Sequence, residues 1–228
     1  MVGGPLDEIG LFCGTFNPIH IGHLLIAEAA REQFNLDKVL FVLSPQPPHR
    51  SGGLLASEDR YKLVQAACES NPHFEPSRLE LDRPGPSYTV DTAIDVQKLY
   101  PQSRINLIIG GDNLPFLKEW HNIQTLLKMV RLLVIPRLRL VDDKTSTTGI
   151  SDRIGELQMD TSLARDLDAS VLLEAVDFPG IGISASGIRG RLSANLSVLY
   201  MVPESVNKII LQNGFYKTTG TVGRAVDK

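Results

Sequence analysis

The sequence predicts a doubly wound α/β domain, in which a mostly parallel sheet carries helices on both faces. Short apolar runs alternate along the chain with longer segments whose apolar residues recur at helical spacing. The apolar runs are nearly continuous, which is typical of parallel strands that are buried on both sides. The length of 228 residues fits a single domain with a full core and a small C-terminal helical portion.

The N-terminal half contains three predicted strands, each followed by a helical pattern. The first strand, "IGLFCG", precedes the helical segment "IGHLLIAEAAREQF", and "KVLFVLS" is the second strand. Ser57 is the expected N-cap of the second helix, because serine hydroxyls accept hydrogen bonds from free amides at helix starts. The expected strands and helices alternate, in chain order, at 9–14, 21–34, 38–44, 57–70, 74–82 and 87–100.

The C-terminal half contains three more predicted strands, at 104–111, 129–137 and 170–177, of which "RINLIIGG" is the clearest. The segment 138–169 is polar, and its sequence predicts an exposed loop before a short helix. The tail "KTTGTVGRAVDK" lacks apolar periodicity, so we expect it to be mobile or held by a partner. These patterns predict one domain at 1–216 and a mobile tail at 217–228.

Composition and charge exclude several classes of protein. The formal net charge is −3 without blocks of like charge, which argues against a nucleic-acid partner. Cys13 and Cys68 form no CxxC pair, so we expect buried free thiols in a reducing compartment. No signal peptide and no apolar run of membrane-spanning length is recognisable, which predicts a cytoplasmic protein without a membrane partner. The oligomeric state stays open, a homo-oligomer included.

The stretch "GTFNPIHIGH" lies between the first predicted strand and the first helix. In open parallel sheets, ligands bind beyond the carboxyl ends of the strands, where helices begin. Gly14 allows the backbone to approach a ligand, and free amides at the helix start favour phosphate. His20 and His23 lie three residues apart, so both imidazoles are able to donate hydrogen bonds there. A zinc site is the minor alternative, since HEXXH is absent.

A second candidate anion site is the stretch "ISASGIRGRL" near the other end of the chain. Ser184 is the expected N-cap of a helix. Ser186 and Arg189 then lie on one helix face, because they are three residues apart. A hydroxyl, a guanidinium and free amides at one helix start favour phosphate, although this pattern alone occurs often by chance.

Taken in order, the motifs "GTFNPIHIGH", "PPHR", "SYTVDT", "IIGGDNL", "EW", "VIPR" and "ISASGIR" resemble those of bacterial nicotinate-nucleotide adenylyltransferases. The resemblance covers residues 9 to about 216, and it implies the Rossmann-like fold of the nucleotidyltransferase superfamily. It also implies transfer of the AMP part of ATP to nicotinate mononucleotide, which releases pyrophosphate and forms deamido-NAD. Such reactions are catalysed mainly by alignment and charge neutralisation.

The resemblance assigns roles toward ATP to residues at the ends of several strands. It implies that His20, His23 and Arg189 are catalytic, with His23 nearest the transition state and Arg189 on the leaving pyrophosphate. Mg²⁺ is expected to be carried mainly by the ATP phosphates, with its protein ligands unknown. For Asp112 the alternative is a helix N-cap, and for Arg50 a solvated loop residue. The implied ATP-binding and phosphate-binding residues are Gly14, Thr15, Phe16, Arg50, Gly110, Asp112, Arg137, Ser184 and Ser186.

The nicotinate side is predicted from "SYTVDT" and "KEW". Tyr88, Thr89 and Val90 lie at a helix start, where free amides favour an anionic pyridine carboxylate. Trp120, the only tryptophan, is placed to stack on the pyridinium ring, although composition alone would make it a core aromatic. Nicotinamide mononucleotide and phosphopantetheine stay open as acceptors, as does a non-catalytic nucleotide-binding module. A P-loop enzyme is excluded, because the sequence contains no Walker A motif.

Overall fold

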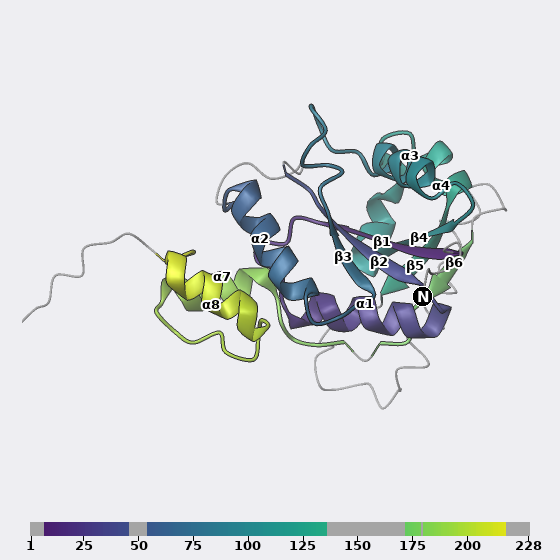
Figure 1. The fold of residues 1–228 in the computed structure, drawn as a ribbon. Helices are drawn as coiled ribbons and strands as arrows, with labels where there is room; N and C mark the ends of the chain where they lie inside the picture. The colour runs from purple at the N-terminus through teal and green to yellow at the C-terminus, as the bar shows by residue number, and fades with distance from the viewer. Residues whose placement is uncertain (1–6, 46–53, 136–171, 179, 218–228) are drawn as a thin grey trace, which may run out of the picture.

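The computed structural model describes residues 7–45, 54–135, 172–178 and 180–217. Six parallel strands form one sheet in the order β3-β2-β1-β4-β5-β6, so the predicted parallel α/β class is confirmed (Figure 1). The order reverses beside β1, which is the position where such sheets bind ligands. The strands are β1 (Glu8–Gly14), β2 (Lys38–Leu43), β3 (Phe74–Ser77), β4 (Arg104–Gly110), β5 (Val130–Ile135) and β6 (Leu173–Ala175).

Helices cover both faces of the sheet, and each face has its own apolar core (Figure 1). In β2 the side chain of Phe41 packs into one core, whereas Leu40 and Val42 pack into the other. This alternation is the period of two that a strand imposes on its side chains. One face is covered by α1 (Ile21–Phe34) and α2 (Ser57–Cys68), and α7 (Ala185–Ser193) and α8 (Glu204–Asn213) share the core on this side, beside α2. The other face is covered by α3 (Thr89–Leu99), the 3₁₀ helix η1 (Gly111–Glu119) and α4 (Ile123–Met129).

The predicted N-cap of the second helix is wrong, and the N-cap alternative for Asp112 does not hold. The N-cap of α2 is Ala56, whose carbonyl accepts a hydrogen bond from the Arg60 amide, so Ser57 is the first helical residue. The stretch after β4 is a 3₁₀ helix whose N-cap is Gly110, so Asp112 lies within its first turn and is not its cap. Pro115 lies inside η1, and a proline removes an amide that an α-helix would use.

The edge strands are shorter than expected. β3 ends at Ser77 and contains Pro76, which is tolerated because β3 lies at the edge of the sheet and pairs only with β2. β6, at the opposite edge, is limited to Leu173–Ala175 within the described residues. No described helix combines the length and the apolar character that a membrane crossing requires.

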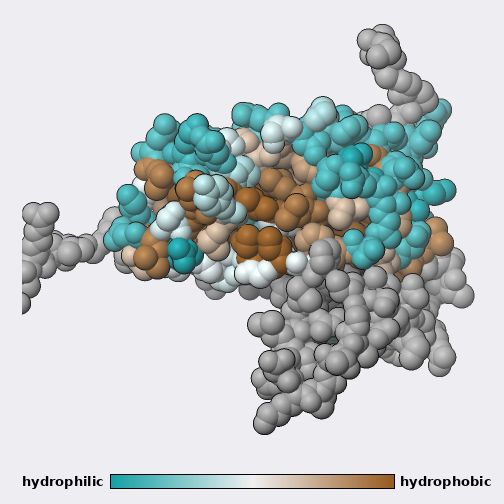
Figure 2. Space-filling view, turned by 90° about the horizontal axis from the view of Figure 1, so that it is seen from below, coloured by the Kyte–Doolittle hydropathy of each residue, from teal (hydrophilic) through white to brown (hydrophobic). Residues whose placement is uncertain are grey.

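The segment before α7 lies beside the start of α1. A Cβ atom added at Gly22 of α1 would lie 3.2 Å from the Ile181 side chain. Figure 2 looks onto the face along which α1 lies and shows apolar residues across its middle. Leu25 of α1 and Ile181 are two large apolar residues that remain exposed, by 42% and 39%. The chain that leads into α7 therefore returns to the start of α1, where both histidines lie.

Candidate active site at the carboxyl edge of the sheet

The turn after β1 is shaped by Gly14 and Phe16. Phe16 adopts a left-handed backbone conformation with φ of 43°, and its ring folds back over Gly14. A Cβ atom at Gly14 would lie only 2.9 Å from this ring, so glycine is required there. The Phe16 ring is buried in the core, which leaves only its backbone for a ligand.

Arg60 of α2 joins the loops that surround this turn. Its guanidinium donates hydrogen bonds to the carbonyl oxygens of Thr15, Ser44 and Pro45 at 2.7–2.8 Å, and its Nε donates to Leu55 at 2.9 Å. The residue is 1% exposed, and burial lowers the pKa of its guanidinium. One buried side chain thus fixes the ends of β1 and β2 relative to α2. From the sequence alone, Arg60 is recognisable only as a residue of a predicted helix, and its bonds to these loops are not.

The two histidines form a stacked pair at the start of α1. Their ring centroids are 3.7 Å apart, with an angle of 22° between the ring planes. The amide of His20, the N-cap residue, donates a hydrogen bond of 3.2 Å to Nδ1 of His23. Because this Nδ1 accepts, the neutral ring carries its proton on Nε2, which becomes a hydrogen-bond donor. The spacing of three residues therefore places both imidazoles together, as expected.

Burial controls the protonation of both rings. It lowers the pKa of His20 to about 4. Burial and the proximity of His20 lower the pKa of His23 well below its usual value. Both imidazoles are therefore neutral at pH 7 in the absence of a ligand. An adjacent anion favours the charged form of an imidazole, so a phosphate bound here would raise both pKa values and strengthen the hydrogen bonds.

The buried His20 predicts a loss of stability in acid. Its pKa is lowered in the folded state, so between pH 6.5 and about 4 the unfolded chain binds more protons. The free energy of unfolding should therefore fall by about 2 kcal/mol from pH 7 to pH 5 through this residue. Urea unfolding at the two pH values measures the fall, and His20→Asn should show a smaller one. Equal falls in both proteins would contradict the prediction.

The start of α7 is the predicted second anion site. Ser184 is the N-cap, as expected, and its Oγ accepts a hydrogen bond of 3.1 Å from the Gly187 amide. The hydroxyl of Ser186 lies 3.2 Å from that of Ser184. Both serines are exposed, so their hydroxyls and the remaining amides of the first turn face solvent.

Arg189 connects the two helix starts. Its Nη1 donates a hydrogen bond of 2.8 Å to the carbonyl oxygen of Asn17, three residues before His20. The half-buried guanidinium keeps further N–H groups beyond this anchoring bond. Stretches far apart in the sequence are thus joined at one corner of the sheet, and each offers hydrogen-bond donors to an anion.

The residues predicted for nicotinate lie on the α3 and η1 side of the same edge. Tyr88 is the N-cap of α3, and its ring stacks on His121 with centroids 4.2 Å apart. His121 directly follows Trp120, which is half-buried and packs against the core of this face. Val90 is 2% exposed, so its side chain belongs to the core and only its backbone is left for a ligand. His121 is not among the residues that the sequence predicts for the site, and its stack with Tyr88 places it next to them.

Gly110 ends β4, which lies next to β1 in the sheet, and Asp112 follows in the first turn of η1. The Asp112 carboxylate folds back over Gly110, where a Cβ atom would collide with its Oδ1. Across the described ranges, no three His, Cys, Asp or Glu side chains are grouped so that they could hold a metal ion. Thr89 opens the first turn of α3. Arg50 and Arg137 lie outside the described residues.

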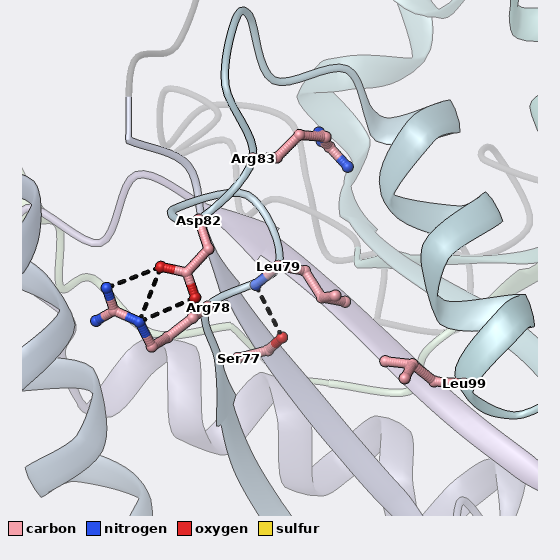
Figure 3. Close-up of a pocket in the computed structure, with 6 residues that line it drawn as sticks. All are labelled: Ser77, Arg78, Leu79, Asp82, Arg83 and Leu99. Carbon is pink, nitrogen blue, oxygen red and sulfur yellow. Dashed lines mark hydrogen bonds and ion pairs between the residues drawn. The ribbon is translucent and has the colours of Figure 1, made fainter.

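A separate hollow of about 370 Å³ lies between the end of β3 and α3 (Figure 3). Arg78 pairs there with Asp82 at 2.9 Å and with Glu58 at 2.8 Å, and Arg83 pairs with Asp95 at 2.9 Å. Both cations are therefore neutralised by carboxylates. None of the predicted site residues lines this hollow; its lining residues are Ser77, Arg78, Leu79, Asp82, Arg83 and Leu99.

A parallel sheet with histidines at one helix start and an arginine from a second is the arrangement that the resemblance to nucleotidyltransferases implies. In agreement, the model of the cytidylyltransferase-like family matches residues 11–191. The solved structure of Plasmodium falciparum nicotinic acid mononucleotide adenylyltransferase, complexed with NaAD, is similar in fold. It has a TM-score of 0.69 at 14% identity and covers 92% of this chain and 97% of its own.

Proteins with similar sequences indicate the family within the nucleotidyltransferases. A probable nicotinate-nucleotide adenylyltransferase of Dictyoglomus thermophilum is 37% identical over 209 residues, which are 92% of this chain and 99% of that protein. One of Desulfitobacterium hafniense, strain DSM 10664 / DCB-2, is 35% identical over 218 residues, or 95% and 99% of the two chains. The chain belongs to the family of nicotinate-nucleotide adenylyltransferases.

Proposed function

We propose that this chain transfers the adenylyl group of ATP to nicotinate mononucleotide, which yields deamido-NAD and pyrophosphate in the biosynthesis of NAD. The observation that carries the proposal is the hydrogen bond from Arg189 to Asn17, because it joins both helix starts at one corner of the sheet. A triphosphate bridging these starts would meet amides, imidazoles and a guanidinium. The choice of nicotinate mononucleotide as the acceptor is based on the names of the relatives.

The reaction is a single displacement on the α-phosphorus of ATP. An oxygen of the acceptor phosphate forms a bond to this phosphorus, and the bond to the bridging oxygen of the leaving pyrophosphate breaks. Negative charge grows on that oxygen and on the oxygens around the phosphorus. His23 donates its Nε2 hydrogen toward them, and Arg189 neutralises the pyrophosphate as it leaves. No covalent intermediate on the protein is required.

We propose that Mg²⁺ accompanies ATP and neutralises charge on its phosphates. Magnesium prefers oxygen ligands and keeps several waters, so phosphate oxygens with few protein ligands suffice. Nitrogen donors such as the two histidines do not suit it. The carboxylate of Asp112, exposed after β4, is of the right chemistry to bind it directly or through water. The chain therefore fits a metal ion that arrives with its substrate.

The nicotinate ring is proposed to bind between Tyr88 and Trp120. The half-buried Trp120 packs on the core with one part of its ring system and leaves another part accessible. Addition of nicotinate mononucleotide should therefore quench its fluorescence, and quenching should saturate with the acceptor. A titration of the intrinsic emission measures this without turnover, since the chain contains no other tryptophan. Ribose 5-phosphate is the control for binding of the phosphate alone. An unchanged emission would show that Trp120 has only a role in packing.

Steady-state kinetics with two acceptors test the proposed function. With saturating MgATP, kcat/KM is measured for nicotinate mononucleotide and nicotinamide mononucleotide side by side, with release of pyrophosphate as the readout. We expect the nicotinate form to be preferred, since helix-start amides favour its carboxylate. Equal values would indicate dual specificity. ATP binding without pyrophosphate release from either acceptor would refute the proposal in favour of a non-catalytic nucleotide-binding module.

A further inference from the structure

A tyrosine from the far end of the chain contacts the residue that anchors Arg189. The hydroxyl of Tyr216 donates a hydrogen bond of 2.9 Å to Oδ1 of Asn17, across 199 positions of sequence. The amide of Leu55 donates to the same oxygen at 3.3 Å. The main-chain oxygen of Asn17 accepts the 2.8 Å bond from Arg189. Asn17, which is 2% exposed, therefore joins three segments through its two oxygens.

Tyr216 is held firmly enough to act as a fixed donor. It follows α8, which packs on α2 through buried apolar residues and a 2.7 Å bond from the Ser205 hydroxyl to the Ala66 carbonyl. Tyr216 has a φ of 64°, a left-handed conformation that is uncommon for a bulky residue. Burial raises the pKa of its phenol, so the hydroxyl stays protonated at neutral pH and donates.

We propose that Tyr216 is a positioning residue for Arg189 and acts through Asn17. The phenol fixes the Asn17 side chain, and this fixes the peptide whose carbonyl orients the guanidinium toward the polyphosphate. The inference rests on the proposed function, since it deepens the assignment of Arg189 to the phosphates of ATP. It gives the C-terminal helix α8 a part in building the site.

A simpler structural role would be that Tyr216 only fastens α8 to the domain. The two roles differ in their dependence on Arg189. A fastening bond contributes the same stability whether or not Arg189 is present. A bond that positions the guanidinium loses its effect on ATP once the guanidinium is removed. Non-additivity between the two residues therefore separates the roles.

The test is a double-mutant cycle with Tyr216→Phe and Arg189→Ala. Tyr216→Phe keeps the ring and removes one hydrogen bond, so the KM for ATP should rise by about fivefold, with the KM of the acceptor unchanged. In the Arg189→Ala background the same substitution should change the KM for ATP by less than about 1.5-fold. Tyr61→Phe is the matched control. Its buried ring loses a hydroxyl bonded at 3.4 Å to Pro76, so the KM for ATP should not change.

Equal rises in both backgrounds, or no rise in either, would overturn the inference. The same cycle is measured on the Kd for MgATP by titration calorimetry without acceptor, with the same pattern expected. A wild-type protein that binds ATP without turnover would refute the proposed function, and the calorimetric cycle would still test the role of Tyr216.

Discussion

Replacement of His23 by alanine is expected to lower kcat by about 10²–10³-fold, the effect of losing one preorganised donor to a transition state. The Nδ1 atom of His23 is already bonded to the amide of His20, so the side chain presents Nε2 in a fixed orientation. The KM values should change less than kcat, because the donor is needed most when charge develops on the phosphoryl oxygens. Pyrophosphate release under saturating substrates measures the loss.

His73→Ala is the matched control for this variant. His73 is exposed and its Nδ1 lies 3.0 Å from the carbonyl oxygen of Asp37, far along the chain from the predicted site. The kcat of the His73→Ala protein should equal that of the wild type. Thermal unfolding of His23→Ala should be followed in parallel, since its ring also packs edge-on against Phe16 at 5.2 Å. A folded His23→Ala protein that keeps near-wild-type turnover would refute the role given to this residue.

Arg189→Ala should lower kcat/KM for ATP by about 10²-fold, through a higher KM for ATP and a lower kcat together. The guanidinium is proposed to contact the pyrophosphate part of ATP both before and during its departure. Its removal weakens ground-state binding and also leaves growing charge without a counter-charge. Initial rates over a matrix of ATP and acceptor concentrations separate the two contributions.

Arg191→Ala on the same helix controls for the loss of positive charge. Arg191 is exposed, and its Nε donates to the Ser197 carbonyl at 2.8 Å. Two positions along a helix place it on a different face from Arg189. Its kinetic constants should remain within about twofold of the wild type, since exposed charges contribute little at physiological ionic strength. If Arg189→Ala changed only the KM of the acceptor, its assignment to the pyrophosphate would be wrong.

Most of the fold could be predicted because local pattern and tertiary burial agree. β1, α1 and β4 lie where apolar runs and helical spacing place them. The N-caps could not be predicted from residue type alone. Serine and aspartate are common helix caps, but Ala56 and Gly110 take these positions.

The motifs of the candidate site could be predicted from the sequence, but the hydrogen bonds that assemble them could not. The stretches around His20 and Arg189 are recognisable in the sequence by their residue types and spacing. The hydrogen bonds that assemble them join Arg60 to Thr15 across 45 positions and Tyr216 to Asn17 across 199. Local sequence carries no signal for such pairs, because they depend on packing of the finished domain. The burial of the Phe16 and Val90 side chains likewise follows from packing.

The central claim is that both helix starts hold one polyphosphate, and a crystal structure with Mg²⁺ and a non-hydrolysable ATP analogue tests it most directly. The account predicts that Nε2 of His23 and the guanidinium of Arg189 both lie within hydrogen-bond distance of phosphate oxygens of the same triphosphate. A triphosphate that contacts only one of the two helix starts, or neither, would contradict it.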